Sequence, residues 1–158
     1  MCRRRARLFA RGAKARSGAR AVRRYVLDAN ALLIYLGDRE GAARVQALLN
    51  ESLRSRSPLL MSAVNWGEVV YSIWKQGGEA EARRVEKNIA HLPLVILPAD
   101  RERATAAAEL KARHSLGYAD SFAADLALAN GATLVTADPE FARLGKRLLV
   151  LALPRHKS

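Results

Sequence analysis

Residues 25–37 read YVLDANALLIYLG, a short apolar run that ends in an acid and continues into a second apolar run. The first run, through Leu27, is rich in residues that favour strands and is short enough for a buried strand. The second has the length of a short helix that stops at Gly37. An apolar strand followed directly by a helix is the repeating unit of a parallel α/β sheet, and this stretch therefore predicts the class of the fold.

The same unit recurs along the chain. Short apolar runs predict four more strands, at residues 58–61, 94–97, 133–136 and 148–152. Helical spacing predicts helices over residues 29–36, 39–55, 62–76, 79–91, 101–114 and 118–130, and a short helix opening at Asp138-Pro139. Ser62 and Asp100 are suitable N-caps, and Gly77-Gly78 is expected to end one helix before the next begins. Strands alternating with helices predict a single α/β domain whose parallel sheet is covered on both faces.

The basic residues are unevenly distributed. The chain has 158 residues and a formal net charge of +12, but ten of its 27 Lys and Arg lie in residues 1–24, which contain no acid. The remaining residues carry 17 basic groups against 15 acids. We therefore predict a basic N-terminal arm over residues 1–23 and a single domain over residues 24–158. The charge alone is weak support for a nucleic-acid partner.

The arm has three possible roles. It could bind nucleic acid through a set of five arginines, Arg3, Arg4, Arg5, Arg23 and Arg24. It could resemble an Arg-rich, acid-poor organelle transit peptide. It could also be a solvated extension without a function, because blocks of like charge are commonly disordered.

Composition excludes several classes of protein. A single cysteine, Cys2, cannot form an internal disulfide, which fits a reducing compartment, and we expect a cytoplasmic protein. No apolar run approaches the roughly 18–20 residues of a membrane span, and no apolar stretch follows the arm as in a secretory signal. We therefore expect no membrane partner.

Acidic residues gather near the predicted carboxyl ends of the strands. Asp28 ends the first strand, Asp138 follows the fourth, Glu68 lies two turns into the helix after the second, and Asp120 begins the helix before the fourth. Functional groups of open parallel sheets collect at this edge. Several carboxylates brought together there would call for a hard divalent cation such as Mg²⁺ or Mn²⁺.

Each acid also has a simpler interpretation. Asp28, Asp120 and Asp138 could each be a helix N-cap. Glu68 could be a solvated helix residue. Asp125 lies five residues after Asp120, about 140° around the helix, and is expected at the surface or in a dimer contact.

Four segments together resemble the acidic motifs of PIN-domain ribonucleases, in the same order and the same strand contexts. They are VLDANALL (26–33), SAVNWGEVV (62–70), YADSFAA (118–124) and LVTADPEF (134–141). Within that family the motifs are most similar to those of VapC-type toxins from toxin–antitoxin pairs. The resemblance implies a three-layer sandwich in which helices flank a five-stranded parallel sheet of order 3-2-1-4-5.

The resemblance also implies an activity and a site. The expected activity is that of an endoribonuclease that uses Mg²⁺ or Mn²⁺ to hydrolyse RNA phosphodiesters and leaves a 5′-phosphate and a 3′-hydroxyl. The matching catalytic acids are Asp28, Glu68, Asp120 and Asp138. Of these, Asp28, Asp120 and Asp138 are the expected metal ligands. Asn30 and Thr136 match neighbouring polar positions that orient the site.

The family also implies partners. These are an RNA substrate, a cognate VapB-type antitoxin whose peptide crosses the first helices and the acidic pocket, and a second copy of the chain in a homodimer. Trp66, Tyr71 and Trp74 could serve such contacts, or could simply pack in the core.

Other functions remain open at this point. The chain could be a housekeeping PIN nuclease in RNA processing, or a non-catalytic RNA-binding module that uses the basic arm. A phosphatase of the haloacid dehalogenase type is disfavoured, because that chemistry needs a second Asp where this sequence has Asn30.

Overall fold

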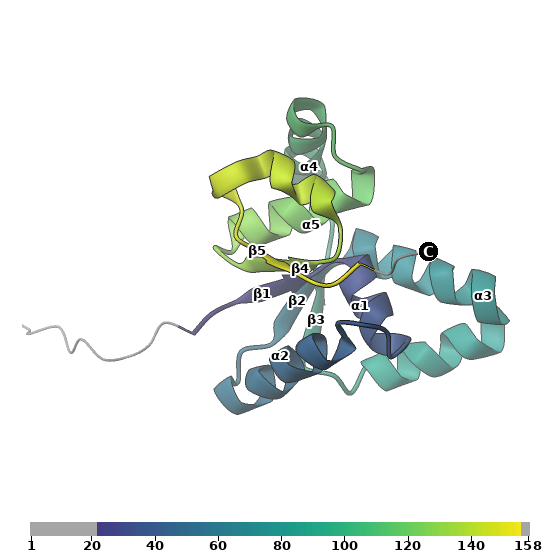
Figure 1. Ribbon diagram of the computed structural model, residues 1–158. Coiled ribbons are helices and arrows are strands. Elements are labelled where there is room, and N and C mark those ends of the chain that lie inside the picture. Colours follow the sequence, from purple (N-terminus) through teal and green to yellow (C-terminus); the bar gives the residue numbers. More distant parts are fainter. Residues whose placement is uncertain (1–21, 156–158) are drawn as a thin grey trace, which may run out of the picture.

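A central parallel sheet organises residues 22–155, the part of the chain that the computed structural model describes (Figure 1). Its strands are β1 (Tyr25–Leu27), β2 (Leu59–Ser62), β3 (Leu94–Leu97), β4 (Thr133–Thr136) and β5 (Val150–Ala152). They lie in the order β3-β2-β1-β4-β5, and all neighbouring pairs are parallel. The predicted order and the predicted parallel sheet are confirmed.

Helices cover both faces of the sheet and produce three layers (Figure 1). On one side lie α1 (Ala29–Leu36), α2 (Ala42–Ser55) and α3 (Ala63–Ile89). On the other side lie α4 (Arg101–His114), α5 (Tyr118–Ala129) and the 3₁₀ helix η1 (Pro139–Arg147). Within the described residues, no helix combines the length and the apolar character needed to cross a bilayer.

The alternation of side chains along the strands separates two hydrophobic cores. Leu27 and Val135 pack with α1, α2 and α3, whereas Val26 and Leu134 pack with α5 and η1. All four are fully buried. Because successive strand residues point to opposite faces, the central strands β1 and β4 contribute to both cores.

The break at Gly77-Gly78 follows the sequence prediction, whereas the last strand differs from it in length. The predicted break at Gly77-Gly78 is confirmed, because α3 consists of two helical segments joined at a kink where Gly78 adopts φ 75° and ψ −175°. The last strand is two residues shorter than predicted and begins at Val150. Tyr71 and Trp74 are exposed (63% and 42%), so only Trp66 of the three aromatic residues packs against the core.

Candidate active site

Asp28 lies at the carboxyl end of β1 and caps α1. Its carboxylate accepts the Ala31 N–H at 2.7 Å, so the capping interpretation is correct. The side chain is nevertheless buried, and it lines a pocket at this edge of the sheet. Burial raises the pKa of Asp28 to about 7; the Thr136 hydroxyl and the Ala31 N–H lower it, and the nearby charges of Asp120 and Asp138 raise it.

Thr136 joins two of the acidic positions. Its hydroxyl hydrogen-bonds the Asp28 carboxylate. The same oxygen accepts the N–H of Asp138 at 2.9 Å. Thr136 is buried at the end of β4, so this link has a fixed position. Thr136 therefore links the Asp28 carboxylate to the backbone of Asp138.

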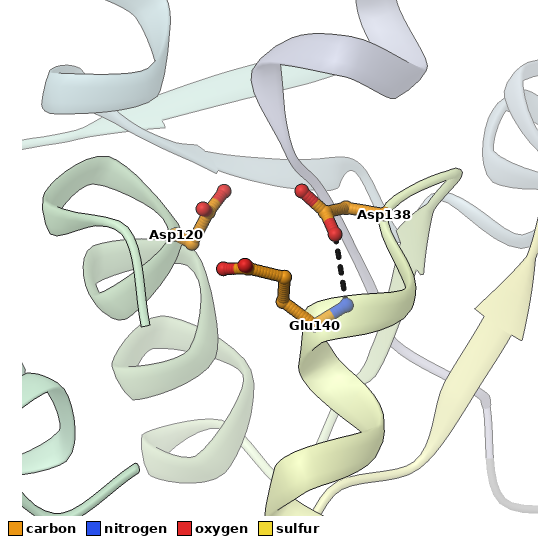
Figure 2. A group of neighbouring side chains, drawn as sticks. All are labelled: Asp120, Asp138 and Glu140. Carbon is orange, nitrogen blue, oxygen red and sulfur yellow. Dashed lines mark hydrogen bonds between the residues drawn. The ribbon is translucent and has the colours of Figure 1, made fainter. Parts of the chain in front are cut away.

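A second group of acids lies between α5 and η1. Figure 2 shows the carboxylates of Asp120, Asp138 and Glu140 pointing toward one another. One carboxylate oxygen from each residue lies within 4.8 Å of the others. Asp138 is the N-cap of η1 and accepts the Glu140 N–H at 2.8 Å, shown by the dashed line. Glu140 belongs to this group, although it was not among the predicted site residues.

Asp120 lies in the first turn of α5, but it is not the cap of that helix, which begins after Gly117. The capping interpretation of Asp120 is therefore wrong. Burial raises its pKa, the neighbouring Asp138 and Glu140 raise it further, and Lys111 lowers it. A Cβ atom at position 117 would collide with the Asp120 carboxylate. Glycine at this position therefore leaves room for the acid.

The pocket brings all four predicted acids together. It has a volume of about 280 Å³, and its lining includes Asp28, Glu68, Asp120 and Asp138. Glu68 reaches it from α3, and its pKa is raised by partial burial and by the charge of Asp120. Asn30 lines the same pocket with an exposed side chain.

Asn65 connects the two segments that carry Asp28 and Asp120. Its Oδ1 accepts the N–H of Ala29 at 3.2 Å, and its Nδ2 donates to the carbonyl of Ala119 at 2.7 Å. The side chain is only 1% exposed. This contact has no signature in the sequence, because both partners of the Asn65 side chain are backbone groups.

The donor set is suited to a hard divalent cation. Oxygen atoms on opposite sides of a bound Mg²⁺ are about 4 Å apart, so carboxylates within 4.8 Å of one another need little movement to share an ion. The raised pKa values of Asp28, Glu68 and Asp120 point the same way, because burial and mutual repulsion disfavour their charged forms. A divalent cation offsets both costs.

The remaining predicted residues lie elsewhere. Arg3, Arg4 and Arg5 are outside the described residues, as is most of the arm. Arg23 and Arg24 are exposed and precede β1, whereas Asp28 follows it, so they lie at the opposite end of that strand.

Asp125 is buried in the chain, whereas the sequence had predicted a position at the surface or in a dimer contact. It is 7% exposed and forms an ion pair with Arg103 of α4 at 3.3 Å. The helical rotation correctly placed it away from Asp120. What the rotation could not indicate is that α4 packs over this face of α5.

The fold and the pocket define an α/β domain with a carboxylate site at the C-terminal edge of its sheet. Residues 25–147 match the model of the PIN domain family, and the chain belongs to this family. No curated protein matches the chain.

Several solved structures share the fold. VapBC2 from Rickettsia felis, bound to a DNA fragment from the promoter, is 20% identical, with a TM-score of 0.62 over 82% of this chain and 98% of that one. DNA-bound VapBC from Salmonella typhimurium is 19% identical, with a TM-score of 0.65 over 83% and 98%. VapC20 from Mycobacterium tuberculosis, a sarcin-ricin loop cleaving toxin, is 16% identical, with a TM-score of 0.56 over 77% and 95%.

Proposed function

We propose that the chain is a divalent-metal-dependent endoribonuclease and the toxin of a toxin–antitoxin pair. The observation that carries the nuclease proposal is the pocket in which Asp28, Glu68, Asp120 and Asp138 converge from β1, α3, α5 and the end of β4. Membership of the PIN family and the RNA-cleaving activity of a toxin with this fold support it.

Each acid has a role that suits its surroundings. Asp28, Asp120 and Asp138 would hold Mg²⁺ or Mn²⁺, and Glu140 is a further candidate ligand because its carboxylate lies beside theirs. A bound cation would neutralise charge that builds on the phosphate and lower the pKa of a coordinated water.

Other polar residues of the pocket would position these ligands, and one of them would accept a proton from the attacking water. Glu68 is exposed, lies across the pocket on α3, and has a raised pKa, which suits it to take a proton from the attacking water. Thr136 holds Asp28 relative to Asp138, and Asn30 lies where it can contact the substrate.

The toxin assignment rests on the shared fold and on a groove beside the site. The two VapBC structures named above are complexes with their antitoxins. In this chain a groove of about 480 Å³ runs between α1 and α3 and is lined by Leu33, Leu36, Ile73 and Val85 among others. It borders the acidic pocket, with which it shares Asn30 and Leu33. We propose that a VapB-type antitoxin peptide binds there, that the toxin is a homodimer, and that it acts on RNA in the cytoplasm.

Expression of matched variants tests this function. The wild-type chain, Asp28→Ala and Asp100→Ala would be expressed in the same host, and the 5′ ends of cellular RNA mapped. Asp100 is the matched control, because it is also an N-cap acid but is exposed and does not line the acidic pocket. We expect growth arrest and new 5′ ends with wild type and Asp100→Ala only. New 5′ ends in all three strains, or in none, would refute the proposal.

A further inference from the structure

A second pocket lies directly beside the acidic one. It has a volume of about 310 Å³ and shares Asn30 and Asp138 with the acidic pocket. Its lining differs in charge, because two arginines, Arg39 and Arg155, contribute to it. A basic pocket therefore adjoins the carboxylate site on the side of Asp138.

The two arginines come from distant segments that pack together. Arg39 lies in the loop between α1 and α2, where its N–H donates to the Ile34 carbonyl at 3.0 Å. Arg155 follows β5, and the buried Leu153 anchors this segment by donating its N–H to the Thr136 carbonyl at 2.7 Å. The two segments meet at Gly41, where an added Cβ would lie 3.1 Å from Pro154. The fold therefore holds both arginines on one side of the site.

Other cations near the acids are already engaged. Lys111 donates to the Leu116 carbonyl at 3.0 Å, and Arg143 donates to the Ser115 carbonyl and pairs with Glu140 at 3.3 Å. In contrast, neither Arg39 nor Arg155 forms an ion pair with any residue of the described range 22–155. Their guanidinium groups are available to a ligand.

We propose that Arg39 and Arg155 form a phosphate-binding subsite for the RNA phosphodiester adjacent to the one cleaved. The inference rests on the proposed nuclease function and assigns part of the substrate contact to named residues. Guanidinium groups bind phosphate oxygens through paired hydrogen bonds. They also reduce the repulsion between a polyanion and a pocket of carboxylates, so the substrate can enter from this side.

Steady-state cleavage of a short single-stranded RNA with Mn²⁺ tests the subsite. The variants are Arg39→Gln, Arg155→Gln and the double variant. The matched control is Arg44→Gln, which removes an equal charge from an exposed position in a separate pocket near Tyr25. Loss of a charged hydrogen bond predicts a KM increase of about tenfold for each test variant, with little change in kcat. The control should behave as wild type, and equal effects in all variants would overturn the proposal.

A modified substrate identifies the phosphate concerned. Replacing the linkage on one side of the scissile phosphate by a neutral methylphosphonate should impair the wild-type enzyme about as much as the double variant does. The same replacement should cause no further loss in the double variant, because both changes remove the same interaction. Losses that multiply for linkages on both sides would refute the assignment.

Failure of the phosphate-binding subsite can be distinguished from failure of the proposed nuclease function. If the wild-type chain cleaves no RNA with Mn²⁺, the nuclease proposal fails. The subsite is then tested by binding of the same fluorescent RNA at increasing salt. The double variant should bind the RNA about tenfold more weakly than Arg44→Gln does. In a plot of the logarithm of the binding constant against the logarithm of the salt concentration, its slope should be shallower by about 0.7 for each phosphate that the protein no longer neutralises. Equal affinities would overturn the subsite as well.

Discussion

Replacing Asp28 by Asn should stabilise the metal-free protein. The folded state keeps this carboxyl protonated up to about pH 7, whereas an unfolded chain ionises it at the ordinary pKa of 3.8. Folding at higher pH must therefore either retain the proton or bury the charge. The stability of the wild type consequently falls as the pH rises from 3.8 to about 7, and the full penalty is present above that value.

The size of the effect follows from the two pKa values. One pH unit of difference corresponds to 1.36 kcal/mol, so the penalty is about 4 kcal/mol at pH 8 and about 2 kcal/mol at pH 5.5. Asn removes this penalty and retains an oxygen that can cap α1. The unfolding free energy of Asp28→Asn should thus exceed that of the wild type by about 4 kcal/mol at pH 8 and by about 2 kcal/mol at pH 5.5.

Urea denaturation in EDTA, followed by the fluorescence of Trp66 and Trp74, measures this difference. Asp100→Asn is the control, because Asp100 makes the same kind of cap at an exposed position and accepts the Arg103 N–H at 2.9 Å. Added Mn²⁺ should reduce the difference in unfolding free energy between Asp28→Asn and the wild type, because it stabilises only the folded wild type. If Asp28→Asn were no more stable than the wild type at pH 8, burial would not raise the pKa of Asp28 in the way described.

Three further substitutions test the supports of the site. Asn65→Ala removes the side-chain partner of the buried Ala29 N–H and a bond to the part-buried Ala119 carbonyl, and should lower the unfolding free energy in urea by roughly 1–3 kcal/mol; an unchanged value would contradict the bridging role. Gly117→Ala places a methyl group against the neighbouring carboxylate and should weaken Mn²⁺ binding about tenfold by calorimetry, while Gly67→Ala, where the added atom meets nothing within 4 Å, should not. Arg103→Gln leaves the buried Asp125 unpaired and should lower the unfolding free energy by about 2 kcal/mol. The loss should appear as a lower thermal midpoint, without a change in Mn²⁺ affinity.

The sheet and the main acids could be predicted because their causes are local. Short apolar runs formed the strands, and the carboxyl ends of parallel strands meet at one edge, which brought Asp28 and Asp138 together. The strand order itself came from the family resemblance.

Residues that were missed depend on contacts between distant segments. Glu140 was not among the predicted site residues, and its place beside Asp120 depends on the turn that Asp138 begins by accepting the Glu140 N–H. Asn65 bonds only to backbone, and Asp125 is buried only because Arg103 and α4 lie over it. A single sequence contains no local pattern for such tertiary neighbours.

The division between two hydrophobic cores has a consequence for biosynthesis. Glu68 is carried by the layer of α1, α2 and α3, whereas Asp120 and Glu140 belong to the opposite layer of α5 and η1. A chain emerging from the ribosome presents the helices α1, α2 and α3 before α5 and η1 have been synthesised. The carboxylate set therefore does not exist until residues beyond 140 have been translated and both layers have docked. A copy that ends before residue 138 therefore lacks part of the acidic pocket.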